Sequence, residues 1–139
     1  MKNLIIIILI AITSFGCSKN NDDPKTNIPG NLIGKWKLIE IYTNSGNGEN
    51  YWVKTDTGKP YDIWYKENSE IVISSMSENC NTGTFVVSSD NKITYSFPCT
   101  GDSNVKIESL SETNLITDVT YIEYELNKYQ KISDQNPII

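Results

Sequence analysis

Short segments rich in β-branched and aromatic residues alternate with clusters of Asn, Gly, Ser and Asp, which recur about every 8 to 12 residues from residue 34 onward. Branched and aromatic side chains fit the pleated surface of a sheet, whereas the four turn-forming residues tolerate tight backbone bends. No segment shows the apolar periodicity of an amphipathic helix. The pattern therefore predicts an all-β domain whose strands are joined in sequence.

Eight or nine strands are predicted, and strands that follow one another through short turns favour an antiparallel up-and-down meander. Asn47-Gly48 is the strongest hairpin signal, because both residue types tolerate the positive φ of a type I′ turn. The predicted strands cover residues 34–43, 51–54, 61–66, 70–76, 83–88, 92–97, 105–110, 115–119 and 121–132.

Two of these segments alternate apolar and polar residues, which predicts one buried and one solvated face on each. The residues expected inside are Ile93, Tyr95 and Phe97 in one segment and Ile122, Tyr124 and Leu126 in the other. The first segment changes phase, since Trp36 and Leu38 share one face while Ile39 and Ile41 share the other. A β-bulge near Leu38 would bring both pairs to one side.

The N-terminus resembles a bacterial lipoprotein signal. A positively charged start is followed by an apolar run over residues 4–12, which as a helix would rise only about 14 Å and is too short to span a bilayer. The run ends at Ser14-Phe15-Gly16-Cys17, which resembles a lipobox. The resemblance implies cleavage before Cys17, diacylation of its sulfur and acylation of its new amine. An ordinary signal peptide followed by an incidental cysteine is the alternative.

The expected organisation has four parts. Residues 1–16 are the signal peptide, residues 17–30 the lipidated cysteine with a flexible polar tether, residues 31–133 the folded domain and residues 134–139 a tail. Lys19 followed by Asp22-Asp23 resembles the signal that sends some lipoproteins to the cell surface of certain diderm bacteria. We expect an outer-membrane protein held by its lipid and exposed at the cell surface, with the inner leaflet as the alternative.

Cys80 and Cys99 remain once Cys17 is committed to lipid. An even pair of cysteines in an oxidising compartment is expected to form a disulfide. Two free thiols or a soft metal site are the alternatives, although a metal would need further ligands. A three-residue turn over residues 89–91 places Phe85 opposite Tyr95, and continuing this register brings Cys80 to within one residue of Cys99.

The segment Leu32-Ile33-Gly34-Lys35-Trp36-Lys37-Leu38 resembles the Gly-x-Trp start of the lipocalin-like domain found in bacterial lipoproteins. The resemblance covers about residues 31–133 and implies that the meander closes into a small barrel, with Trp36 packed across its closed end. The late Arg that lipocalins place over this Trp is missing, which leaves Lys128 or Lys131 as substitutes. The rival immunoglobulin-type sandwich is disfavoured, because no Trp lies between the two later cysteines.

Absent residue types argue against several functions. The chain has no His and no Arg, and 17 acidic residues outnumber 12 lysines to give a net charge of −5. Without His there is no imidazole base and no His-ligated metal. An acidic, Arg-free chain is poorly suited to nucleic-acid phosphates. We therefore expect no enzyme, no catalytic residue, no metal, no cofactor and no nucleic-acid partner.

Acidic residues that are close in sequence do not change this expectation. The pairs Glu67/Glu70 and Glu108/Glu112 are explained by solvated strand ends. Asp102-Ser103-Asn104 is interpreted as a turn, because it lacks the Gly and distal Glu of a calcium loop.

Two functions remain open. An eight-stranded barrel can hold one small ligand, which makes a hydrophobic or amphiphilic molecule the first expected partner. The candidate ligand-binding residues are Tyr51, Trp52, Trp64, Tyr65, Tyr95 and Phe97, for which core packing is the alternative. The second function is a cell-surface module that contacts a protein or glycan and has a filled, ligand-free barrel.

Overall fold

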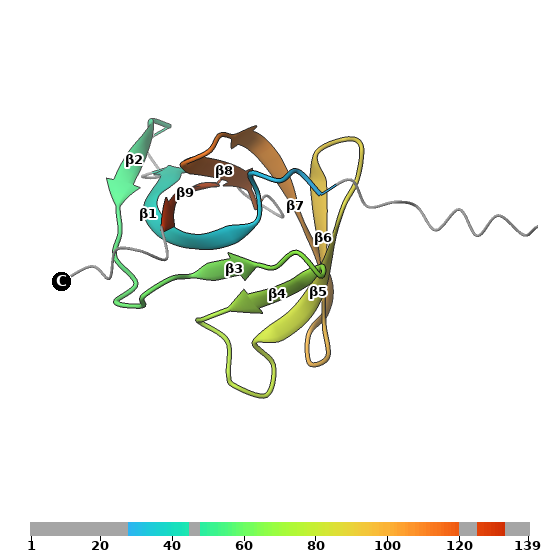
Figure 1. Ribbon diagram of the computed structural model, residues 1–139. Helices are drawn as coiled ribbons and strands as arrows, with labels where there is room; N and C mark the ends of the chain where they lie inside the picture. Colours follow the sequence, from blue (N-terminus) through green and yellow to red (C-terminus); the bar gives the residue numbers. More distant parts are fainter. Residues whose placement is uncertain (1–27, 45–47, 120–124, 133–139) are drawn as a thin grey trace, which may run out of the picture.

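The computed structural model describes residues 28–44, 48–119 and 125–132, and within these ranges the chain forms nine strands and no helix (Figure 1). Of the predicted parts, residues 1–16, most of the tether with Cys17, and the tail lie outside the described residues. The strands are β1 (Gly34–Asn44), β2 (Asn50–Lys54), β3 (Ile63–Tyr65), β4 (Glu70–Ile73), β5 (Thr82–Val87), β6 (Lys92–Phe97), β7 (Gly101–Leu110), β8 (Asn114–Asp118) and β9 (Leu126–Ile132).

Eight strands close into an antiparallel barrel. From β3 to β9 each strand pairs with the next in sequence, and β1 closes the ring by pairing with β3 on one edge and with β9 on the other. The first pairing runs from Gly34 opposite Tyr65 to Trp36 opposite Ile63. This closed up-and-down arrangement confirms the expected lipocalin-like barrel.

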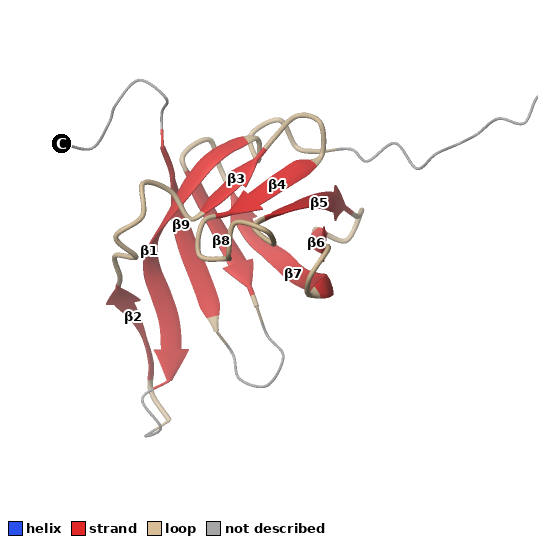
Figure 2. Cartoon of the chain, turned by 90° about the horizontal axis from the view of Figure 1, so that it is seen from below, coloured by secondary structure: helices blue, strands red, loops and turns tan. Residues whose placement is uncertain are grey.

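Strand β2 lies outside the ring. It pairs only with the second half of β1, from Glu40 opposite Lys54 to Asn44 opposite Asn50, beyond the residues that β1 shares with β3. All five of its residues are exposed, and Figure 2 shows it at the margin of the barrel. The long first strand therefore serves both the barrel and a hairpin that projects from it.

Several predictions of register are confirmed. The pairing of β1 with β9 shifts between Leu38 and Glu40, which is the expected bulge. Strands β5 and β6 place Phe85 opposite Tyr95 and Val87 opposite Ile93. Along β6 the predicted inner face is the buried one.

The predicted disulfide is also present. Cys80 and Cys99 are bridged, with their Cα atoms 5.6 Å apart. The bridge ties the segment that follows β4 to the turn between β6 and β7.

Two predictions were wrong. Residues 102–104 lie within β7 rather than in a turn, since β6 turns earlier, over residues 98–100. In β9 the buried residue is Tyr129, so alternation turns Asn127 inward and Leu126 outward, opposite Tyr42 of β1. The expected phase rested on Ile122 and Tyr124, which lie outside the described residues.

The core fills one end of the barrel. The segment before β1 crosses this end and buries Leu32 against Trp36, whose Nε1 donates a 2.8 Å hydrogen bond to the Leu32 carbonyl. The other fully or almost fully buried large side chains in this core include Tyr65, Ile71, Phe85, Ile93 and Leu115. The covering segment and these side chains together close this end of the barrel.

Candidate functional site: an internal cavity

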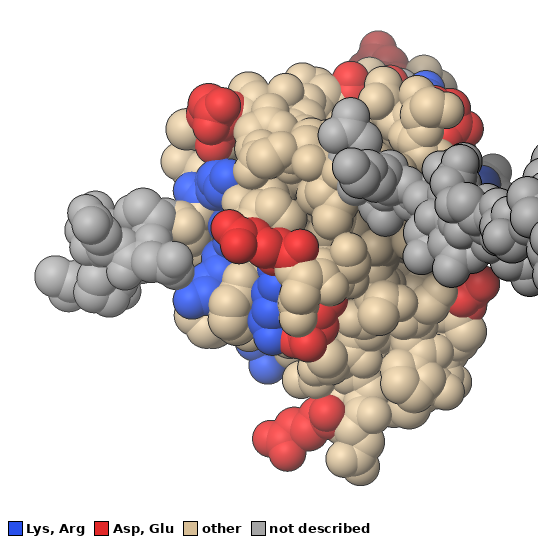
Figure 3. Space-filling model, turned by 45° about the vertical axis from the view of Figure 1, so that its right-hand side comes forward, with Lys and Arg blue, Asp and Glu red and all other residues tan. Residues whose placement is uncertain are grey.

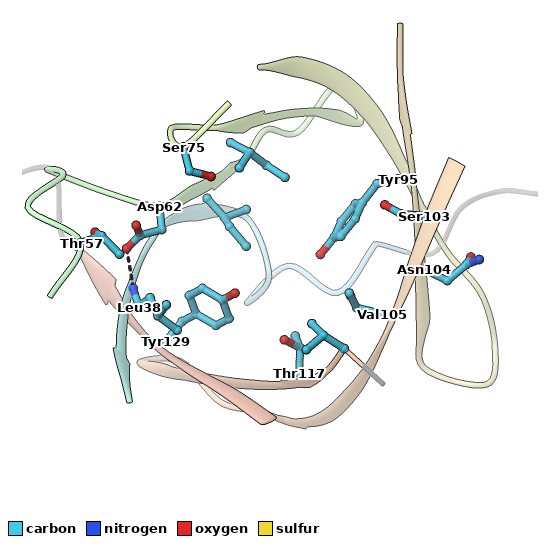
Figure 4. A pocket seen from close by; sticks show the side chains of 13 residues that line it. Leu38, Thr57, Asp62, Ser75, Tyr95, Ser103, Asn104, Val105, Thr117 and Tyr129 are labelled. Atoms are coloured by element: carbon cyan, nitrogen blue, oxygen red, sulfur yellow. Dashed lines mark hydrogen bonds between the residues drawn. The ribbon is translucent and has the colours of Figure 1, made fainter. Parts of the chain in front are cut away.

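A cavity of about 540 Å³ lies within the barrel, lined by side chains from strands around the ring (Figure 4). β1 begins at the closed end and reaches the cavity at Leu38. β7 runs antiparallel to β1 and contributes Ser103, Asn104 and Val105 from its first half. Its wall residues are Leu38, Thr57, Asp62, Ile63, Ile73, Ser75, Tyr95, Ser103, Asn104, Val105, Thr117, Val119 and Tyr129. The volume falls within the range of about 300–1,000 Å³ typical of small-molecule sites.

Two tyrosines from opposite walls direct their hydroxyl groups toward the centre of the cavity. Figure 4 shows Tyr95 of β6 and Tyr129 of β9 in this arrangement, with Thr117 of β8 between them on the lower wall. The Tyr95 hydroxyl lies 2.5 Å from that of Tyr65, which is completely buried in the core below. The tyrosine pair therefore joins the cavity floor to the packed end of the barrel.

Burial makes these hydroxyls harder to ionise than an ordinary tyrosine, which is already protonated at neutral pH. Desolvation raises the pKa of Tyr95 and of Tyr129 well above the ordinary value, because the phenolate would lose its hydration. Hydrogen bonds with Thr117 and Asn127 partly offset the rise in the pKa of Tyr129, while the charge of Asp62 adds to it. The cavity thus offers neutral hydroxyls on largely apolar walls.

A buried carboxylate closes the seam between β1 and β3. β3 stops pairing with β1 at Trp36, and the next N–H along the edge, that of Leu38, donates a 2.7 Å hydrogen bond to Asp62 Oδ2. The Asp62 backbone N–H in turn donates to the Trp36 carbonyl at 2.8 Å. The Asp62 carboxylate therefore accepts the bond that a neighbouring strand's carbonyl would otherwise accept. It is also the one carboxylate among the residues that line the cavity.

Lys37 balances this carboxylate from outside the wall. Its Nζ lies 3.9 Å from Asp62 Oδ2 and 3.0 Å from Asp56 Oδ1. It also donates to Thr57 Oγ1 and to the Lys59 carbonyl, each at 2.7 Å. The backbone N–H of Gly58 and the Lys37 ammonium lower the pKa of Asp56. These bonds fix the loop that follows β2 against the rim of the cavity.

Charges on the outer surface are interspersed rather than gathered by sign. On the face seen in Figure 3, lysines lie beside acidic side chains and adjoin a broad uncharged surface. Ion pairs of this kind join Lys66 to Glu70 and Lys128 to Glu40. Within the described ranges no cluster of three or more metal-binding side chains occurs, and no helix is long and apolar enough to cross a membrane.

The six candidate ligand-binding residues do not come together. Tyr51 and Trp52 are exposed on β2, outside the barrel. Trp64 lies on the outer face of β3, with the ammonium groups of Lys35 and Lys66 at 4.8 and 4.5 Å from its ring. The remaining three gather inside the barrel, where Tyr65 and Phe97 are core residues and Tyr95 alone lines the cavity.

Sequence reasoning missed Asp62, Thr117, Asn127 and Tyr129. Thr117 lies two residues after Leu115 in the predicted strand over residues 115–119, so period-two alternation was a usable signal that both side chains share one face. Tyr129 was missed because the predicted alternation of the last strand placed Leu126 on the inner face and Tyr129 on the outer face. Asp62 lies near Trp64 and Tyr65, two of the candidate ligand-binding residues. No local pattern marks its carboxylate as the acceptor for the β1 backbone beyond the end of β3.

The chain was compared with protein families, curated proteins and solved structures. No family model and no curated protein matches the chain. A solved structure described as a lipocalin-like protein from Bacteroides uniformis is similar to it, with 16% sequence identity and a TM-score of 0.48, over 74% of this chain and 100% of that one. The closed strand pairing described above is what defines the barrel.

Proposed function

We propose that the barrel binds one small, largely apolar molecule, and that lipid on Cys17 holds the protein at the outer membrane, exposed on the cell surface. The observation that carries this proposal is the cavity of about 540 Å³, whose apolar walls hold a few hydroxyl groups. A solid barrel would instead have side chains meeting across its centre. The cavity therefore favours a carrier or sensor over a surface module with a filled barrel.

The arrangement of the two ends supports the same function. The described chain begins at Ile28, which packs against the core at the closed end, whereas the cavity is lined by residues from Leu38 onward. The chain that leads to a lipid on Cys17 would therefore leave the barrel at its closed end and not beside the cavity. A ligand could then enter without crossing the anchor.

Binding rather than catalysis is proposed, because the cavity wall offers no nucleophile with an activating base. Its hydroxyls belong to Ser, Thr and Tyr, and the carboxylate of Asp62 is already bonded to the Leu38 N–H and lies near Lys37. These groups can orient a ligand by hydrogen bonding.

The test recovers the ligand from the full chain. The protein would be purified from its native envelope into lipid nanodiscs, and bound molecules would be extracted and measured by mass spectrometry against empty nanodiscs. Val105→Trp fills the cavity, whereas Val86→Trp places the same side chain on an exposed outer position of β5.

We expect a molecule at about one per chain in the wild type and in Val86→Trp, with a loss of tenfold or more in Val105→Trp. Equal amounts in all three proteins would contradict ligand binding in the barrel. Circular dichroism of both variants checks that the fold is retained.

A further inference from the structure

The cavity wall carries negative but no positive charge. Asp62 is the one carboxylate among the lining residues, and none of them is a lysine. The Lys37 ammonium lies 3.9 Å from the Asp62 carboxylate, but Lys37 faces outward and is not a lining residue. Its ammonium already donates hydrogen bonds to Thr57 and Lys59 on the rim. An anionic ligand group placed here would lose its hydration without gaining a cation.

A hydrogen-bond acceptor beside the cavity is unused. Asn127 Oδ1 is buried and accepts no hydrogen bond from the described residues. Asn127 lies opposite Thr117, which lines the cavity, and two residues before Tyr129 on the same face of β9. An unsatisfied buried acceptor is destabilising, and a hydrogen-bond donor on a ligand would remove that cost.

The neighbouring hydroxyls already have partners. Tyr95 is paired with Tyr65, and Tyr129 is hydrogen-bonded with Thr117 and Asn127. Among the buried side-chain atoms of the described residues, the one without a hydrogen bond is thus an acceptor, Asn127 Oδ1. Together with the carboxylate of Asp62, it gives the cavity a preference for donors.

We infer that the ligand of this cavity bears a hydroxyl or amine head on an apolar body and carries no negative charge. The inference rests on the proposed function and adds a ligand class to it. A fatty-acid or other carboxylate anion of similar size is excluded, because its charge would face Asp62 and no cation. The apolar body fills the space between Leu38, Ile73 and Val105.

The test uses four probes with the same apolar body. These are 2-naphthylmethanol, 2-naphthylmethylamine, naphthalene and 2-naphthoate, titrated by calorimetry into the full chain in nanodiscs, with empty nanodiscs subtracted. We expect the alcohol and the amine to bind at least tenfold more tightly than naphthoate. Asn127→Leu, which removes the unused acceptor at similar volume, should reduce the advantage of the alcohol over naphthalene severalfold while leaving naphthalene binding unchanged.

Asp62→Asn supplies a second, independent variant, because it removes the charge but keeps an oxygen for the Leu38 N–H. It should raise the affinity for naphthoate relative to the alcohol. Naphthoate binding as tightly as the alcohol in the wild type would overturn the inferred ligand class and leave the proposed function standing. Failure of all four probes to bind would contradict the proposed function itself.

Discussion

The ammonium of Lys131 lies 5.3 Å from the centroid of the Trp36 ring at the closed end of the barrel. The same Nζ donates a 2.9 Å hydrogen bond to the Asn31 carbonyl in the segment that crosses this end. Of the two lysines considered as substitutes for the missing arginine, Lys131 is therefore the one placed over the tryptophan. A single cation here links the covering segment, the first strand and the last strand.

Removal of this cation should destabilise the barrel. Lys131→Met loses the cation–π contact and leaves the Asn31 carbonyl without its donor, so we expect the free energy of unfolding to fall by about 1–3 kcal/mol. Lys131→Arg should retain stability, because a guanidinium can stack on the indole and still donate. Urea denaturation followed by tryptophan fluorescence measures both.

Lys128→Met is the matched control for that experiment. Lys128 lies 5.5 Å from the ring of Trp52 and pairs with Glu40, but on the outer surface of the barrel. Its loss should cost less than about 1 kcal/mol, as for other partly exposed pairs. Equal losses for the two Met variants would show that Lys131 has no special role at the closed end.

The disulfide should contribute mainly by restricting the unfolded chain. Cys80 and Cys99 are 19 residues apart in sequence, and closing a loop of this size is worth about 3 kcal/mol in the chain-entropy model. The double variant Cys80→Ser/Cys99→Ser should unfold at correspondingly lower urea concentration. Wild-type protein unfolded with a reductant should match the variant, and a persistent difference would assign the loss to the serines instead.

Local signals were sufficient for the strands and for one hairpin. β5 and β6 alternate cleanly and are joined by a short turn, so their register follows from a single pairing of apolar residues, Phe85 with Tyr95. The bulge in β1 was predictable because the apolar phase of the sequence changes at Leu38. In each case the deciding residues lie within one strand or one hairpin.

Long-range pairing was not predictable in the same way. β1 pairs with three strands. Its pairing with β3 ends at Trp36; beyond that point Asp62 accepts the bond from the Leu38 N–H, and β2 then pairs with the same edge of β1 outside the ring. No local pattern encodes this. Aromatic residues did not predict the cavity for a related reason. Trp64 and Tyr95 both have a high β-propensity, and whether each side chain faces inward depends on how the barrel closes.

Gly83 marks a close approach between β5 and β6 that admits no side chain. A Cβ added there would lie 2.4 Å from the backbone carbonyl oxygen of Ser96 and 2.7 Å from Cδ1 of Phe97. Gly83→Ala should therefore lower the free energy of unfolding by about 1–3 kcal/mol through overpacking. Gly30→Ala is the control, because its Cβ would meet nothing within 4 Å, and comparable losses in the two would contradict the steric explanation.

The free energy of unfolding should fall more when the acceptor oxygen of Asp62 is removed than when only its charge is removed. Asp62→Ala strands the Leu38 N–H at the seam and leaves Lys37 facing a gap, so we expect a loss of about 2–4 kcal/mol. Asp62→Asn keeps an acceptor and should lose less than half as much. Denaturant titrations of both variants measure the difference, and equal losses would mean that the ion pair, rather than the bond to Leu38, closes the seam.

Three buried tyrosines predict cooperative unfolding at high pH. Burial raises the pKa of Tyr65, Tyr95 and Tyr129 above the ordinary value of 10.0, so the folded state keeps their protons while the unfolded state releases them. The contribution of these tyrosines to the free energy of unfolding is therefore fully present below about pH 10. Above that pH the free energy of unfolding falls by about 4 kcal/mol per pH unit for three groups. Phenolate absorbance and circular dichroism should change together during a base titration. Tyr129→Phe should reduce the slope of stability against pH by about one third, and an unchanged slope would show that Tyr129 ionises without unfolding the barrel.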